Sequence, residues 1–242
     1  MGGERIIDDP LTVITLLPLF AGLLLLLLTQ VLPSSQSEGL ARISRNVSMG
    51  IAMAVAVITT MLFIGNWGSI DWTNITQGGY VLQNDAINLI PSIGVTWKVG
   101  ADALSFPMIW LTTALIPISM LVEWDAKRGH LFHPLLLVME GALLGVFVVL
   151  DLFVFYVFWE LTLIPMFLLI LMWGGEDRRY AAMKFFIYTF AASVIMLIGI
   201  LVMYFHTDPI SGLGSLTGHH FDLVAMTAQE NLIPSEGLRH LV

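Results

Sequence analysis

The stretch LFVFYVFWELTLIPMFLLILMW, residues 152–173, decides the fold of this chain. It is 22 residues long and contains one ionisable side chain, that of Glu160. At about 1.5 Å per residue, a helix of this length crosses the roughly 30 Å hydrocarbon core of a bilayer. The stretch therefore predicts a transmembrane helix that carries an acid about 12 Å from its start, near the middle of the membrane.

An acid at that depth needs a physical explanation. A carboxylate there costs roughly 3 kcal/mol or more unless it is paired, protonated or hydrated. Pro165 has no N–H group, so the carbonyl of Leu161 loses its helical partner next to Glu160. One interpretation is a protonated glutamic acid that hydrogen-bonds to a neighbouring helix. We favour a hydrated functional site, because ionisable residues inside membranes usually mark ion pathways.

The composition indicates an all-α, polytopic membrane protein. Hydrophobic residues make up 57% of the chain and charged residues only 12%, about half the charge of an ordinary soluble domain. The absence of cysteine excludes iron–sulfur clusters, thiol catalysis and disulfides from this chain. The net charge is −8 and no basic patch is evident, so nucleic acid is not expected as a partner.

Hydrophobic runs predict six transmembrane helices, at about residues 11–32, 47–65, 103–122, 131–150, 152–173 and 180–205. We expect the polar loop 66–102 to form a short β-hairpin at the membrane surface. The chain then divides into residues 1–130, with the first three helices and this outer loop, residues 131–205, with the last three helices, and a polar outer tail, 206–242.

The positive charges predict the orientation. The loops after the first, third and fifth helices carry Arg42, Arg45, Lys127, Arg128, Arg178 and Arg179, whereas the opposite side carries Arg5, Lys98 and Arg239. Because positive charges accumulate on the cytoplasmic side, these loops are expected in the cytoplasm and both termini outside.

Glu140 is a second acid within a predicted span. Gly141 and Gly145 follow it, and such small residues, four apart, let another helix approach closely. Glu140 is therefore either a proton-carrying group or a structural hydrogen-bonding group at a packed interface.

Lys184 is the third ionisable residue within a span. It shares a helix face with Tyr180 and Tyr188, which lie four residues away on each side. From the cytoplasmic end, Lys184 lies about 6 Å deep and Glu160 about 19 Å deep, so a direct salt bridge is not expected. A water-linked relay and a lysine that extends to the membrane surface both remain open.

The other polar features are weaker. Asp151, between the fourth and fifth helices, is more typical of a solvated turn residue than of a proton entrance. His130 and His133 have a spacing seen in metal sites, but no third ligand is near, so no metal site is expected.

Several motifs resemble those of one family, the M (or 4) subunit of proton-pumping NADH:quinone oxidoreductase, respiratory complex I. They are Phe158-Trp159-Glu160, Leu163-Ile164-Pro165-Met166, Trp173-Gly174-Gly175 and Lys184-Phe185-Phe186-Ile187-Tyr188-Thr189. Residues 100–105 add weaker support, with Ala103 where the family usually has glycine. The resemblance extends over about residues 95–205.

The resemblance implies an antiporter-like pump in the membrane arm of complex I, in the inner (plasma) membrane of a cell. Its partners would be the other membrane-arm subunits and the lipid bilayer. NADH, FMN, iron–sulfur clusters and quinone would be bound by partner subunits, with no cofactor on this chain. The resemblance assigns proton translocation to Glu160, the functional acid of the fifth helix, together with Glu140 and Lys184.

The chain departs from the family in length. Family members are roughly twice as long, and the lysine that pairs with the acid matching Glu160 lies on a seventh helix. We therefore expect a fragment with an incomplete antiporter-like helical repeat, which alone does not pump protons. A subunit of a multi-subunit cation/proton antiporter is the alternative function, and a structural membrane scaffold is a third.

Overall fold

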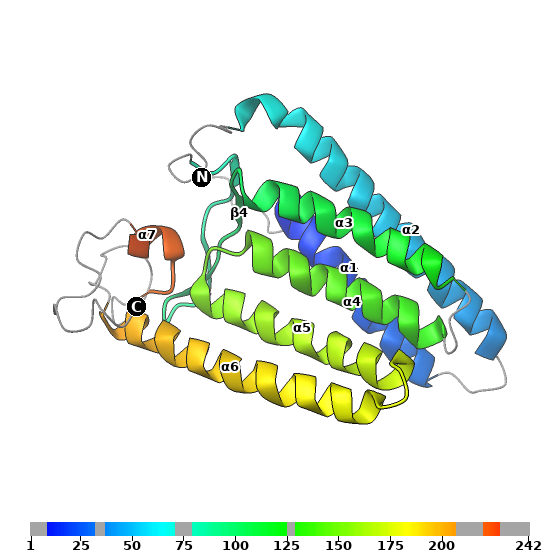
Figure 1. The fold of residues 1–242 in the computed structure, drawn as a ribbon. Helices are drawn as coiled ribbons and strands as arrows, with labels where there is room; N and C mark the ends of the chain where they lie inside the picture. Colours follow the sequence, from blue (N-terminus) through cyan, green and yellow to red (C-terminus); the bar gives the residue numbers. More distant parts are fainter. Residues whose placement is uncertain (1–8, 32–36, 71–78, 125–128, 207–219, 228–242) are drawn as a thin grey trace.

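The computed structural model describes residues 9–31, 37–70, 79–124, 129–206 and 220–227. Within these ranges, six helices are long and apolar enough to cross a membrane, as the sequence predicts. They are α1 (Pro10–Val31), α2 (Ser37–Gly65), α3 (Ser105–Val122), α4 (Gly129–Val148), α5 (Leu152–Trp173) and α6 (Arg178–His206). In Figure 1, α2 to α6 lie side by side in chain order, and α1 packs behind α4.

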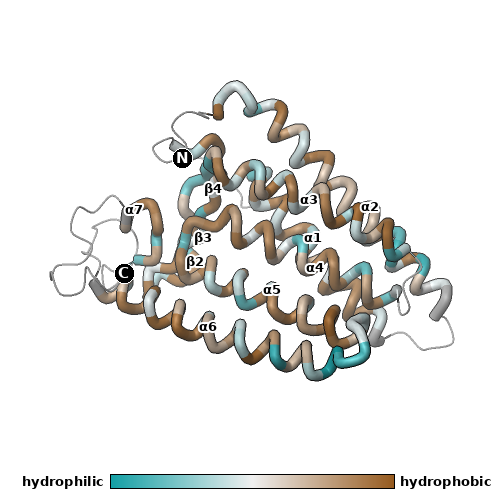
Figure 2. The backbone as a smooth tube through the Cα atoms, viewed as in Figure 1, coloured by the Kyte–Doolittle hydropathy of each residue, from teal (hydrophilic) through white to brown (hydrophobic). Residues whose placement is uncertain are grey.

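The helix α4 is the centre of the bundle, because it packs against α1, α2, α3 and α5. In its most apolar stretch 72% of the residues are buried, compared with 11% in α6. Most of both helices is hydrophobic, although α6 begins with a hydrophilic stretch (Figure 2). The outer face of α6 is therefore exposed and, beyond its first turns, mostly apolar, whereas α4 is enclosed by other helices.

Glycines determine how closely the neighbours of α4 approach. A Cβ atom at Gly141 would lie 2.6 Å from the backbone nitrogen of Leu19 on α1, so only glycine fits between these two helices. A Cβ atom at Gly145 would overlap the ring of Phe158 on α5. The predicted close approach beside Glu140 is confirmed, but the two glycines contact different helices.

The loop between α2 and α3 contains the predicted hairpin. Strand β2 (Ile87–Ile90) pairs antiparallel with β3 (Val95–Trp97), and β1 (Leu82–Gln83) pairs antiparallel with β4 (Gly100–Ala101). Gly94, in the turn before β3, has a φ of 73°, a conformation that favours glycine. A short 3-10 helix (Trp67–Ser69) and the helix α7 (Leu223–Thr227) lie at the same end of the bundle, which we call the hairpin end.

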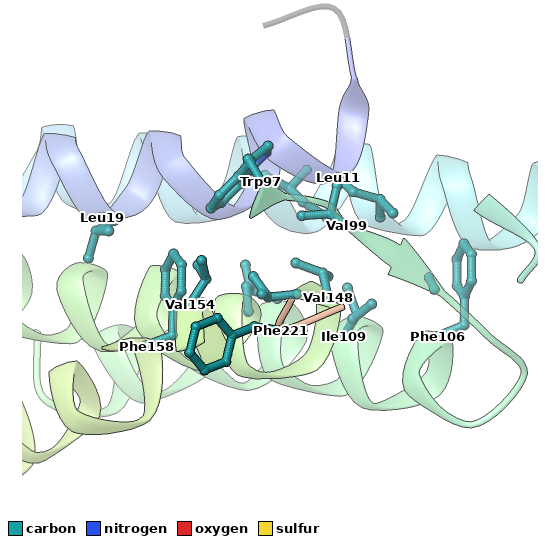
Figure 3. Close-up of a cluster of buried hydrophobic side chains, with 14 of the residues drawn as sticks. Leu11, Leu19, Trp97, Val99, Phe106, Ile109, Val148, Val154, Phe158 and Phe221 are labelled. Atoms are coloured by element: carbon teal, nitrogen blue, oxygen red, sulfur yellow. The ribbon is translucent and has the colours of Figure 1, made fainter. Parts of the chain in front are cut away.

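A buried cluster holds the hairpin against the helices (Figure 3). The ring of Trp97 lies between α1 and α5, with its centroid 6.1 Å from that of Phe158. Its Nε1 donates a hydrogen bond of 3.0 Å to the hydroxyl of Thr12 on α1. Trp97 is only 6% exposed, so it anchors the hairpin in the core.

Candidate functional site

Glu160 lies in the middle of α5 and points toward α6. Its Oε1 atom is buried and has no hydrogen-bond partner within the described residues. Tyr156, one turn earlier on α5, lies near both the Glu160 carboxyl and Ser193 on α6. Ser193 is 3% exposed, and its hydroxyl donates to the carbonyl of Phe190. Tyr156 is therefore a polar neighbour of the acid at the interface between α5 and α6.

A small cavity lies next to this interface. Its volume is ≈150 Å³, and it lies between α4, α5 and α6. It is lined by Met139, Leu143, Trp159, Thr162, Leu163, Met166, Phe185 and Thr189. The hydroxyls of Thr162 and Thr189 donate to carbonyls of their own helices, which leaves their lone pairs available. The space is sufficient for several water molecules next to Trp159, the residue that precedes Glu160 on α5.

Glu140 is fully buried in α4, with an exposed fraction of 0%. Neither of its carboxylate oxygens has a hydrogen-bond partner in the part of the chain that the structure describes. Burying a polar group in this way costs several kcal/mol, so this position is unfavourable unless a partner or a proton is supplied. Glu140 does not form one cluster with Glu160, because the two acids face different neighbours.

Lys184 is exposed on the outer face of α6. Its Nζ atom lies 5.6 Å from the centre of the Tyr180 ring and 5.8 Å from that of the Tyr188 ring. The predicted shared face of these three residues is confirmed. The structure does not bring Lys184 to either acid, in agreement with the expected difference in depth.

The expectation that Asp151 is a solvated turn residue is wrong. Asp151 is 0% exposed and accepts four hydrogen bonds. Its Oδ1 accepts from the backbone nitrogens of Phe153 (3.0 Å) and Val154 (3.1 Å), which caps α5. Its Oδ2 accepts from the backbone nitrogen (2.8 Å) and the hydroxyl (3.2 Å) of Thr96 in β3. Burial raises the pKa of the Asp151 carboxyl, while these hydrogen bonds oppose the rise.

The described part of the tail is attached to the same end of the bundle. Asp222 accepts from the backbone nitrogens of Val224 and Ala225 and so caps α7. Its Oδ2 also lies 2.7 Å from Nζ of Lys98, between β3 and β4. Residues 220–227 thus bind the hairpin, a contact that the polar composition of the tail did not predict. The rest of the tail, residues 207–219 and 228–242, lies outside the described residues.

Sequence reasoning missed Tyr156 and Ser193. Tyr156 precedes Glu160 by four residues, so its position on the same face was available from the spacing alone. Ser193 belongs to another helix, and no local pattern marks it as a neighbour of Tyr156.

Comparison with known proteins identifies relatives of this chain in sequence and in fold. Residues 150–231 match the family described as NADH:quinone oxidoreductase/Mrp antiporter, transmembrane. NAD(P)H-quinone oxidoreductase chain 4 of Prochlorococcus marinus is 40% identical over 156 residues, which cover 64% of this chain and 28% of the relative. F420H2 dehydrogenase subunit M of Methanosarcina mazei is 44% identical over 123 residues, which cover 50% of this chain and 25% of the relative.

Solved structures agree with the sequence relatives. A chain of respiratory complex I from Thermus thermophilus with bound NADH has a TM-score of 0.67 and 29% identity, with 92% of this chain and 40% of that chain covered. A chain of an archaeal membrane-bound sulfane sulfur reductase shares the fold, with a TM-score of 0.61 at 16% identity. In every case the match spans less than half of the longer relative. By sequence and by fold, the chain is therefore a homologue of the chain 4 or subunit M type of antiporter-like membrane subunit, and its residues 150–231 match the NADH:quinone oxidoreductase/Mrp antiporter family.

Proposed function

We propose that this chain forms part of a proton-translocating membrane-arm subunit in an NADH:quinone oxidoreductase of the complex I type. The observation that carries the proposal is the position of Glu160. It is the only acid of α5, it lies in mid-membrane, and it has a buried carboxylate oxygen without a partner in the described chain. Tyr156 is a polar neighbour of this carboxyl group and is itself close to Ser193 on α6.

In this mechanism, Glu160 alternates between a charged and a neutral form. A basic group supplied from outside the described residues pairs with the carboxylate and favours the charged form. When the pair loosens, the carboxylate in its apolar surroundings takes up a proton, and when the pair tightens it releases the proton. Glu140 and Lys184 act as relay groups on either side of this step.

The remaining roles belong to the assembled complex. NADH, FMN, iron–sulfur clusters and quinone are bound by partner subunits, and this chain carries out no redox chemistry. The membrane is the inner (plasma) membrane of the cell. The bias of lysine and arginine orients the Arg45 end of the bundle, where α2, α4 and α6 begin, toward the cytoplasm.

The test is the substitution Glu160→Gln in the complete subunit, within the intact complex reconstituted in lipid vesicles. Glutamine keeps the shape of the side chain but does not titrate. We expect NADH-driven proton translocation to fall by about tenfold or more, because a positioned proton-transfer group is lost. Glu176→Gln is the matched control, since Glu176 is exposed in the loop between α5 and α6 and should leave translocation unchanged.

Unchanged translocation in Glu160→Gln would refute this proposal. The family description also includes the Mrp antiporters, so cation/proton antiport is the second candidate function. It is tested in the same vesicles without NADH or quinone. A proton flux that then depends on an imposed sodium or potassium gradient, and is lost in Glu160→Gln, would favour antiport over quinone-linked pumping.

A further inference from the structure

The proposed function leaves open how a proton reaches Glu140, which is sealed inside the bundle. His133 lies seven residues before Glu140 on α4, and two helical turns place both residues on one face. Both side chains are 0% exposed. Buried polar groups in native proteins nearly always have hydrogen-bond partners, so two such groups on one face of the central helix require an explanation.

The helix α2 contributes a third buried polar group to this face. Pro134 leaves the carbonyl of His130 without its helical partner, and the hydroxyl of Ser44 on α2 donates to it at 3.3 Å. This contact aligns the start of α2 with the start of α4. Ser48, one turn further along α2, is therefore level with His133. It is 0% exposed, and its hydroxyl has no hydrogen-bond partner among the described residues.

The helix α3 supplies backbone and hydroxyl oxygens at the depth of Glu140. The backbone of Met120 lies beside the His133 ring. Because α3 runs antiparallel to α4, the residue seven positions before Met120, Thr113, lies at about the level of Glu140. Thr113 is 0% exposed. Pro117 has no N–H group, so the carbonyl of Thr113 lacks its helical partner there.

We propose that the seam between α2, α3 and α4 is a hydrated proton path from the Arg45 end of the bundle to Glu140, with Ser48 and His133 as its intermediate groups. At its outer end, the guanidinium of Arg45 lies 4.4 Å above the Trp124 ring, whose centroid is 6.2 Å from that of His133. The use of this path in pumping rests on the proposed function, but its existence does not.

The proton balance of the path is simple. Nδ1 of His133 lies 3.0 Å from the carbonyl oxygen of Gly129. The path uses the tautomer in which Nδ1 donates to this oxygen and Nε2 is free to accept a proton. A proton that arrives at Nε2 forms the imidazolium. That proton then passes through water to the Glu140 carboxylate, which becomes neutral, and the ring returns to its first tautomer. The two α-carbons are about 10.5 Å apart along the helix, so the path requires bridging waters between His133 and Glu140, while the Ser48 hydroxyl serves the path at the level of His133.

The path is tested by hydrogen–deuterium exchange at Glu140 in the complete complex. Infrared spectroscopy follows the carbonyl stretch of the protonated carboxyl group, which is identified by its loss in Glu140→Gln. We expect His133→Gln to slow the exchange by about 100-fold, the lower range for a positioned proton-transfer group. Ser48→Ala should slow it in the same direction. Glutamine is close to histidine in volume and polarity, which preserves the packing.

Ser119→Ala is the matched control, because Ser119 is exposed on α3 and its hydroxyl donates to the carbonyl of Leu115 in its own helix, outside the proposed path. Exchange that is slowed by His133→Gln and not by Ser119→Ala supports the path. Unchanged exchange in both His133→Gln and Ser48→Ala, or equal slowing in Ser119→Ala, would overturn it. Failure of the proposed function is separate, since that proposal depends on translocation in Glu160→Gln and this one on exchange at Glu140.

Discussion

Asp151→Ala should destabilise the bundle strongly, because Asp151 is buried between the hairpin and α5. The substitution removes the cap of α5, which typically costs about 1 kcal/mol. It also leaves the backbone N–H of Thr96 buried without an acceptor, which costs about 1–3 kcal/mol. Since all four hydrogen bonds to the carboxyl are lost together, we expect the free energy of unfolding to fall by roughly 2–5 kcal/mol.

The measurement is the unfolding transition of the purified protein in detergent, followed by circular dichroism during titration with a denaturing detergent. Asp151→Asn provides an internal comparison, because it keeps one oxygen acceptor for the cap and should lose less stability than Asp151→Ala. Glu176→Ala, in the exposed loop before α6, should change stability by no more than about 0.5 kcal/mol. If Asp151→Ala unfolds at the same midpoint as Glu176→Ala, the assignment of Asp151 as the link between hairpin and helix is wrong.

Three further predictions concern the packing and charge of the bundle. Gly141→Ala should lower the free energy of unfolding by about 1–3 kcal/mol, because the new methyl group overlaps the α1 backbone. Gly199 has open space around it, so Gly199→Ala should not destabilise the protein. The same detergent titration measures both variants. Lys98→Met removes the ion-pair partner of Asp222, whose Oδ2 lies 2.7 Å from Nζ of Lys98. Proteolytic cleavage after residue 206 should therefore be faster in this variant than in the parent protein. An unchanged cleavage rate would contradict the role of this ion pair. Burial raises the pKa of the Asp151 carboxyl. The stabilisation linked to its protonation is therefore fully present below the ordinary aspartate pKa and is lost as the pH rises through the raised pKa. Asp151→Asn should remove that part of the pH dependence of the unfolding midpoint.

The helices could be predicted from the sequence because their signal is local. The 22-residue run that contains Glu160 gives α5 with the same first and last residues, Leu152 and Trp173. A bilayer imposes length and polarity on each helix separately, so no knowledge of neighbours is needed. The hairpin was predictable for the same reason, from alternating residues and turns such as the one at Gly94.

The polar contacts between helices could not be predicted in this way. Asp151 stands alone between two apolar runs and resembles a surface turn, yet its partner Thr96 is 55 residues away. The sequence marks His133 only by a spacing seen in metal sites. Its complete burial and the helix face that it shares with Glu140 are the features that bear on the proposed path. Such pairings depend on which helices become neighbours, and an apolar helix surface contains little information on that choice.

The enclosure of α4 has a consequence for biosynthesis. A helix that carries Glu140 enters the membrane at a penalty of roughly 3 kcal/mol when lipid surrounds it. Most of the contacts of α4 are with the three helices that precede it along the chain, and its other main helix partner is α5. Because α1, α2 and α3 are synthesised before α4, they can pack against α4 as it leaves the translocon. The order of the helices along the chain therefore places protein, rather than lipid, around Glu140 during insertion.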